Sequence, residues 1–149
     1  MAQKISPRLL EIVNKLPLKE GIRVLEIGCG PGAMAREISK RIGNGHVLAI
    51  DRAATAIQKA ISGSQIEIES GKLSYRQVAL EKFELEPNEE PFDIAVAVRV
   101  GALDGRHPEI EKQSLHKIAE ALTKTGRLFI DAGNPIKEIP LEKYRYHSQ

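Results

Sequence analysis

The chain has 149 residues, of which 42% are hydrophobic and 28% charged, and its net charge is +2. This composition indicates one globular domain over residues 1–149, and the dispersed charges exclude the basic stripe of a nucleic-acid-binding protein. The single cysteine, Cys29, excludes an internal disulfide and a zinc site of several cysteines. Because no apolar run approaches the roughly 18 residues of a membrane span and residues 1–10 lack a signal-peptide pattern, we expect a cytoplasmic enzyme or binding domain without a bound metal.

The first predicted elements are a helix and a buried strand. Ser6 suits the N-cap of a helix and Pro7 its first turn, and the apolar spacing after them continues until Pro17. The nearly continuous apolar run Ile22–Ile27 is typical of a strand that is buried on both faces. Glycines follow this run, and helical spacing then resumes from Met34 until a second group of glycines.

The remainder of the chain alternates in the same way. Four more strands are predicted, over His46–Asp51, Leu73–Val78, Phe92–Val98 and Arg127–Ala132. Helix formers fill Ala53–Ser70, although Gly63 and Ser64 interrupt them and leave a strand after this point as an alternative. A further helix is predicted over Pro108–Leu122, and Gly126 is expected to separate it from the last strand.

Strands that alternate with helices predict a Rossmann-like, doubly wound α/β fold. Right-handed crossovers place helices on both faces of a parallel sheet, here of about five strands, and so produce three layers, α/β/α. Ligands of such sheets bind beyond the carboxyl ends of the strands. The glycine-rich stretch VLEIGCGPGAMAREI, residues 24–38, begins with a predicted strand, so we expect the ligand at the end of that strand.

The glycine spacing admits two interpretations. Glycine turns the backbone sharply and lets a ligand touch the main chain. Gly28-x-Gly30-x-x-Ala33 fits the fingerprint of NAD-binding proteins, whereas Gly28-x-Gly30-x-Gly32 fits a different family of nucleotide-binding domains. Glu26 precedes the first glycine by two residues and favours a cationic ligand, because its carboxylate would repel a pyrophosphate.

The stretch VLEIGCGPG resembles motif I of the class I S-adenosylmethionine-dependent methyltransferases, and the order of elements is similar to that family from Ile5 to about Ala132. Asp51 ends the second predicted strand, where the family places an acid that binds the ribose hydroxyls. The resemblance implies S-adenosylmethionine as cofactor and methyl transfer as the reaction. This transfer is an in-line displacement that depends on orientation, and we identify no catalytic residue for it. A small-molecule acceptor is expected, because the sequence shows no recognition domain for a macromolecule.

The resemblance also implies a set of cofactor-binding residues. They are Glu26, Gly28, Cys29, Gly30, Gly32, Asp51, Arg52, Ala79, Leu80 and Arg99. Many members of the family have an acid near the position of Ala79 that reaches the adenine amino group, so here we expect either main-chain groups near Ala79 and Leu80 or the side chain of Glu81 to take its place. For Cys29 we favour a small side chain that fits beneath the loop over a nucleophile. Arg99 follows the fourth strand and is expected near the cofactor or the acceptor.

The segment after the fifth predicted strand is short. Residues 133–149 do not suffice for the helix and hairpin that complete the sheet in this family. Because an open strand edge invites pairing, we expect either that this segment folds back along the sheet or that a homodimer forms through the fifth-strand edge. The acceptor site is expected between the first helix and the loop Arg99–Pro108. Two alternatives remain open, a non-catalytic S-adenosylmethionine-binding or partner subunit and an NAD-binding protein.

Overall fold

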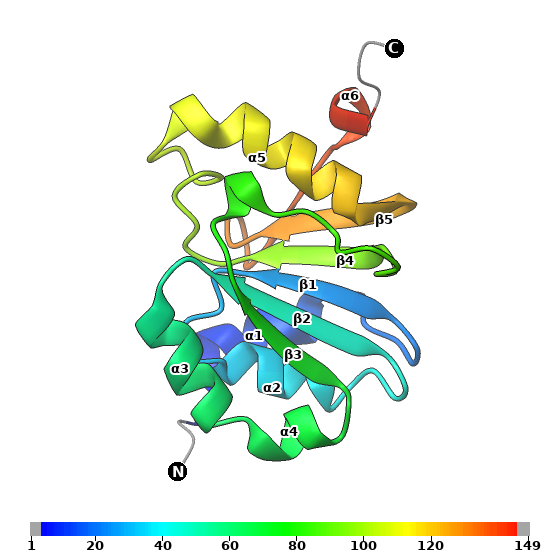
Figure 1. The fold of residues 1–149 in the computed structure, drawn as a ribbon. Coiled ribbons are helices and arrows are strands. Elements are labelled where there is room, and N and C mark those ends of the chain that lie inside the picture. Colours follow the sequence, from blue (N-terminus) through cyan, green and yellow to red (C-terminus); the bar gives the residue numbers. More distant parts are fainter. Residues whose placement is uncertain (1–3, 146–149) are drawn as a thin grey trace.

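The computed structural model describes residues 4–145. Its sheet has six strands in the order β3-β2-β1-β4-β5-β6 (Figure 1). The strands are β1 (Arg23–Ile27), β2 (His46–Asp51), β3 (Leu73–Gln77), β4 (Phe92–Ala97), β5 (Leu122–Ile130) and β6 (Lys137–Ile139). The first five strands run parallel and β6 is antiparallel to β5. The predicted doubly wound fold is therefore confirmed, with one strand added at the β5 edge.

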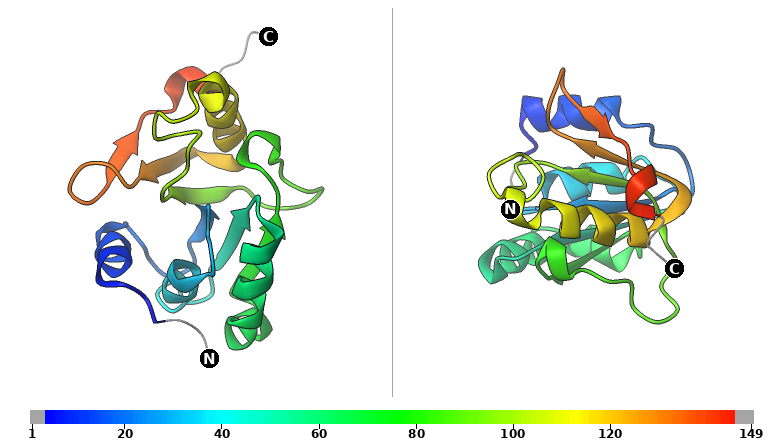
Figure 2. Two further views of the ribbon diagram at one scale, coloured as in Figure 1. Left: turned by 90° about the vertical axis from the view of Figure 1, so that its left-hand side faces the viewer. Right: turned by 90° about the horizontal axis from the view of Figure 1, so that it is seen from above.

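Helices cover both faces of this sheet (Figure 2). They are α1 (Pro7–Lys15), α2 (Ala33–Ser39), α3 (Ala54–Ser62), α4 (Gln65–Glu69), α5 (Pro108–Ala121), α6 (Glu142–Arg145) and the 3-10 helix η1 (Leu80–Lys82). The apolar side chains of α1, α2 and α3 form a core on one face, and those of α5 form a core on the other. Across residues 4–145 we find no helix that combines the length and the apolar character of a membrane span.

The strands are apolar throughout because both of their faces are covered. Along β1, Val24 belongs to the core beneath α1 and α2, whereas Leu25 and Ile27 belong to the core beneath α5. All three side chains are at most 2% exposed. Alternate residues therefore meet opposite cores, which explains the continuous apolar run seen in the sequence.

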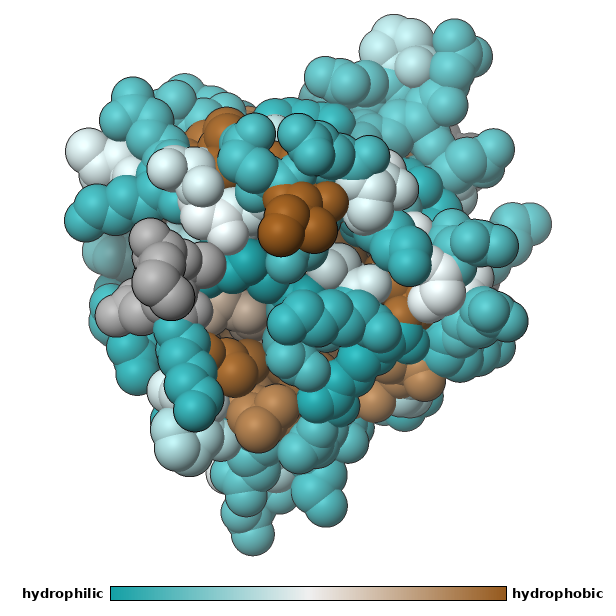
Figure 3. Space-filling model, turned by 90° about the horizontal axis from the view of Figure 1, so that it is seen from below, coloured by the Kyte–Doolittle hydropathy of each residue, from teal (hydrophilic) through white to brown (hydrophobic). Residues whose placement is uncertain are grey.

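The helix predicted over residues 53–70 is divided in two. Ser64 lies between α3 and α4, and its side chain is fully buried. Its hydroxyl accepts a hydrogen bond from Arg36 Nη1 at 3.0 Å and pairs with the Tyr75 hydroxyl at 2.8 Å. The chain turns inward to make these contacts, so one continuous helix is wrong and so is the alternative strand. Ile66 of α4 is 81% exposed. The face of the molecule seen from below is mostly hydrophilic, with separate apolar patches (Figure 3).

Gly126 lies within β5 and does not separate it from the preceding helix. β5 begins at Leu122, directly after α5, and its register with β4 shifts between Phe92 and Ile94. A side chain at Gly126 would crowd Leu122, since its Cβ would lie 2.7 Å from the Leu122 Cβ. Between the pairs Phe92–Leu122 and Ile94–Arg127, β5 has more residues than β4, and this irregularity requires a glycine at position 126. The predicted start of this strand at Arg127 is therefore wrong.

The segment after β5 folds back along the sheet, which is one of the two expected arrangements. β6 pairs with residues 128–130 of β5, and Arg127 of β5 forms an ion pair with Glu138 of β6 at 2.8 Å. The α6 helix packs on α5, where the rings of His116 and Tyr144 meet edge to face at 5.2 Å. Arg145 then donates to the carbonyl oxygen of Thr123 at 2.8 Å. Residues 146–149 lie outside the described residues, and the homodimer stays a prediction.

We expect deletion of residues 136–149 to lower solubility or raise the oligomeric mass. The deletion removes β6 and α6 and so leaves the β5 edge unpaired at Leu128–Ile130. Light scattering of the purified protein measures the mass, and a shorter deletion of residues 146–149 is the control. A chain without residues 136–149 that keeps its mass and solubility would contradict a covering role for this segment.

Candidate functional site

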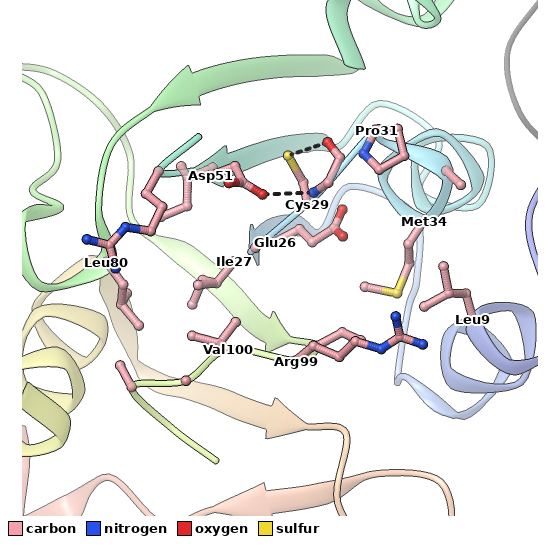
Figure 4. A pocket seen from close by; sticks show the side chains of 18 of the residues that line it. Leu9, Glu26, Ile27, Cys29, Pro31, Met34, Asp51, Leu80, Arg99 and Val100 are labelled. Carbon is pink, nitrogen blue, oxygen red and sulfur yellow. Dashed lines mark hydrogen bonds between the residues drawn. The ribbon is translucent and has the colours of Figure 1, made fainter. Parts of the chain in front are cut away.

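A cavity of about 690 Å³ opens at the carboxyl ends of β1, β2 and β4. Its remaining walls come from α1, the start of α2, the segment after β3 and the loop between β4 and α5. Figure 4 shows that Glu26, Asp51 and Arg99, which lie far apart in the sequence, surround this one space. The cavity therefore occupies the edge of the sheet where the sequence predicts a ligand, and it extends to the boundaries expected for the acceptor.

Three glycines shape the turn after β1, each for a different reason. Gly28, Gly30 and Gly32 have φ values of 76°, 54° and 92°, which side chains rarely adopt. A Cβ on Gly28 would lie 2.9 Å from Val100, whereas a Cβ on Gly30 would have no neighbour within 4 Å. Gly30 is thus the open floor of the cavity. Gly32 does not line the cavity, and a Cβ there would overlap the Tyr75 hydroxyl beneath the turn.

Asp51 holds the turn in place from the end of β2. Its Oδ2 accepts the Gly30 N–H at 3.0 Å, and its Oδ1 accepts the Ala53 N–H at 2.9 Å. The side chain is half-buried and lines the cavity, so the carboxylate also faces a ligand. The sequence predicts the second of these roles and not the first.

Glu26 is a buried acid without a partner for one of its oxygens. Its side chain points into the cavity from β1 and is 2% exposed (Figure 4). Among the described residues, no group forms a hydrogen bond to Glu26 Oε1. Burial raises the pKa of Glu26 to about 8, the negative charge of Asp51 adds to this shift, and Arg36 opposes it. A buried orphan acceptor of this kind indicates a cationic or hydrogen-bonding ligand in the cavity.

Cys29 is buried beneath the same turn and is not activated as a nucleophile. Its thiol donates to the Gly30 carbonyl oxygen at 3.5 Å. Burial raises the pKa of this thiol, and the negative charges of Glu26 and Asp51 raise it further. The side chain lines part of the cavity, consistent with the small space-filling role expected from the sequence.

Arg36 supports the turn from below and was not singled out from the sequence. Its side chain is only 7% exposed, and Nη1 donates both to the Pro31 carbonyl oxygen at 2.9 Å and to the Ser64 hydroxyl at 3.0 Å. Ser64 in turn pairs with Tyr75, whose pKa is raised to about 12 by burial. A single arginine thus connects the glycine turn, the α3–α4 junction and β3.

The β3 side of the cavity is apolar with a charged rim. Val78, Leu80 and Ile27 line it, and Arg52 and Glu81 lie beside them. Ala79, which the family resemblance placed among the cofactor-binding residues, does not line the cavity.

Arg99 occupies the opposite end in a strained backbone conformation. Its φ is 57°, in the left-handed region, and its N–H donates to Asp131 Oδ1 at 3.2 Å. The other oxygen of Asp131 forms an ion pair with Arg8 of α1 at 3.3 Å. Asp131 therefore links the ends of α1 and β5 to the loop after β4. No group of three His, Cys, Asp or Glu side chains in residues 4–145 could hold a metal ion.

Comparison with known proteins matches the chain to one family. The model of a family described as a methyltransferase domain matches residues 24–126. No curated protein sequence matches the chain.

Solved structures share its fold, and two of the following three are named as methyltransferases. The YcgJ protein from Bacillus subtilis has a TM-score of 0.63 at 21% identity, over 83% of this chain and 49% of that one. An S-adenosylmethionine-dependent methyltransferase from Thiobacillus denitrificans, in complex with S-adenosyl-L-homocysteine, has a TM-score of 0.65 at 19% identity, over 87% and 50%. Haemonchus contortus phosphoethanolamine N-methyltransferase 2, in complex with S-adenosyl-L-methionine, has a TM-score of 0.65 at 24% identity, over 83% and 27%. The chain spans half or less of the length of these three structures.

The buried carboxyl of Glu26 predicts a stability that depends on pH. Its pKa is raised from 4.5 to about 8 in the folded protein, so the neutral form stabilises the fold fully below pH 4.5 and this contribution is lost as pH rises through about 8. Glu26→Gln cannot ionise, so its melting temperature should exceed that of the wild type by a difference that grows up to about pH 8 and then levels off. Calorimetric melting of the ligand-free protein measures this difference. The exposed Glu11→Gln serves as control, and a difference for Glu26→Gln that stays constant with pH would contradict the assignment.

Proposed function

Because the chain belongs to the methyltransferase-domain family, we propose that it binds S-adenosylmethionine in this cavity and transfers the methyl group to a small-molecule acceptor. The observation that carries the proposal is the buried, partnerless oxygen of Glu26. A carboxylate at the base of the cavity suits the ammonium of an amino-acid nucleoside and disfavours the pyrophosphate of NAD. The ligands of the related structures from Thiobacillus denitrificans and Haemonchus contortus support this choice of cofactor.

The remaining residues of the cavity fit the other parts of this cofactor. Asp51 faces the cavity with a carboxylate that suits the two ribose hydroxyls. Gly28 and Gly30 let the nucleoside approach the main chain, and Leu80 provides an apolar wall for the adenine beside Arg52. Cys29 completes the floor, whereas Gly32 acts indirectly by keeping Tyr75 beneath the turn, and Ala79 is left without a direct contact.

The chain contributes orientation and electrostatics to the reaction. When bound, S-adenosylmethionine supplies a methyl group on a sulfonium, which is open to in-line displacement. Asp51 and Arg36 fix the turn, so the floor of the cavity does not need to reorganise when a ligand binds. α1 and the loop after β4 enclose the space in which an acceptor would lie, and positioning alone contributes roughly 7–11 kcal/mol to such reactions. No dedicated acid or base is needed for an acceptor that is already nucleophilic.

Isothermal titration calorimetry with S-adenosylhomocysteine and with NAD tests the cofactor. We expect binding of the sulfur nucleoside and no binding of NAD. Glu26→Gln should weaken binding of S-adenosylhomocysteine by about 1.5–3 kcal/mol, the contribution of a charged hydrogen bond. Heat from NAD, with none from S-adenosylhomocysteine, would assign the cavity to a dinucleotide instead. Methyl transfer to a panel of metabolites then distinguishes an active enzyme from a non-catalytic cofactor-binding subunit.

Substitution of Gly30 tests how closely the ligand approaches the main chain. Gly30→Val should abolish S-adenosylhomocysteine binding, because its side chain would enter the open cavity. Gly21→Val is a matched control. Gly21 also has a positive φ, 85°, and free space around its Cβ, but it precedes β1 and does not line the cavity. Equal losses of binding in both variants would attribute the effect to backbone strain, and binding by Gly30→Val within about tenfold of the wild type would show that the ligand lies elsewhere.

A further inference from the structure

The acids that line the cavity lie on the β1, β2 and β3 side, where Arg52 accompanies them, and the other basic side chains gather elsewhere. Glu26 and Asp51 lie at the ends of β1 and β2, and Glu81 lies beyond them after β3. The end of the cavity between α1 and the loop after β4 is lined by basic side chains and by no acid. They are Lys4, Arg8, Arg99, Arg106 and His107. We name this set the basic end of the cavity.

Nearby carboxylates neutralise part of the basic end. Asp131 pairs with Arg8 at 3.3 Å, and Asp104 pairs with Arg106 at 2.9 Å. In contrast, the guanidinium of Arg99 forms no hydrogen bond or ion pair with any other residue in the range 4–145. Arg99 therefore presents an uncompensated positive charge to the cavity.

The backbone of Arg99 is held so that this charge stays in the cavity. Its N–H donates to Asp131 and its carbonyl oxygen accepts from Arg106 Nη2 at 2.9 Å. These two contacts maintain a φ of 57°, which costs conformational energy for any residue other than glycine. In Figure 4 the Arg99 side chain extends toward Met34 and Leu9, across the space below Glu26. Surrounding contacts thus maintain a strained backbone that directs an unpaired guanidinium into the cavity. Such an arrangement indicates that the guanidinium binds a ligand.

We propose that the methyl acceptor is an acid and that Arg99 binds its carboxylate or phosphate group, with Arg8 beside it. This proposal rests on the proposed function and adds the class of substrate. A guanidinium forms two parallel hydrogen bonds with either group, which fixes the orientation of the acceptor as well as its position. S-Adenosylmethionine also carries a carboxylate, but its ammonium and sulfonium bring two positive charges. The bound cofactor therefore has no net negative charge with which to neutralise the basic end. An acidic acceptor supplies this negative charge.

Inorganic phosphate is the probe for the acceptor's anionic group. Thermal melting of protein saturated with S-adenosylhomocysteine is measured with phosphate and with chloride at equal ionic strength. Phosphate should raise the melting temperature of the wild type by about 2 °C or more. The rise should disappear in Arg99→Gln and persist in Lys112→Gln, which removes one exposed positive charge of α5 outside the cavity. Glutamine at position 99 is strained by the positive φ as arginine is, so the two proteins differ mainly in the guanidinium group.

Calorimetry distinguishes the acceptor's anion from the carboxylate of the cofactor. The family resemblance places Arg99 among the cofactor-binding residues, whereas this proposal assigns its guanidinium to the acceptor, so we expect Arg99→Gln to bind S-adenosylhomocysteine within about threefold of the wild type. A loss of about tenfold or more, with unchanged affinity for 5′-methylthioadenosine, which lacks the amino-acid carboxylate, would overturn the proposal and assign Arg99 to the cofactor. An equal phosphate effect in the wild type and Arg99→Gln, or none in either, would also overturn it. If S-adenosylhomocysteine does not bind the wild type, the proposed function fails, and the phosphate comparison on free protein still decides whether Arg99 binds an anion.

Discussion

The carboxylate of Asp51 ties the turn after β1 to the end of β2, and the shape of the cavity depends on this connection. Gly30 and Ala53 both donate to Asp51, while Gly28 and Cys29 donate to the Ile50 carbonyl oxygen. These four hydrogen bonds hold the turn against the end of β2 and the start of α3, beside the cavity that Glu26 lines. The same carboxylate adds a negative charge next to the buried acid and helps to raise its pKa. Asp51 therefore fixes the geometry of the floor and adds to the pKa shift of Glu26, of which burial is the larger cause.

The parts of the structure that are local in sequence could be predicted. β2 has the predicted bounds, and Ser6 caps α1 by accepting the Leu9 N–H, because apolar runs and caps act over a few residues. The end of β1 placed Glu26 and the glycines at one edge of the sheet, and the end of β2 brought Asp51 to the same edge. These residues line or shape the cavity because parallel strands end together, and this rule requires no knowledge of side-chain contacts.

The parts that depend on distant contacts could not be predicted. In the sequence, Arg36 resembles an ordinary polar residue of a helix. In the structure it is buried, and its guanidinium donates hydrogen bonds to the Pro31 carbonyl oxygen and the Ser64 hydroxyl. The division of α3 from α4 follows from the same network. β6 exists because its residues pair with β5, a contact that no local periodicity records. The sequence predicts a boundary at Gly126 because glycine commonly ends elements, whereas the crowding around Leu122 that requires a glycine appears only in three dimensions.

The cavity contains two ionisable groups that residues 4–145 do not satisfy, Glu26 at the end of β1 and Arg99 just after the neighbouring β4. Burial raises the pKa of Glu26, so its carboxyl group binds a proton more tightly than a carboxyl group in water. Arg99 remains charged, and hydrogen bonds to Asp131 and Arg106 hold its backbone in a strained conformation. At either position, a residue without an unsatisfied ionisable group would give a more stable fold, so both residues lower the stability of the ligand-free protein and ligand binding can offset this loss. Ligands that bring an ammonium to Glu26 and an anion to Arg99 stabilise the protein by mass action. The proposed cationic nucleoside and the proposed acidic acceptor would each satisfy one of these two groups, so the cavity suits the binding of both together.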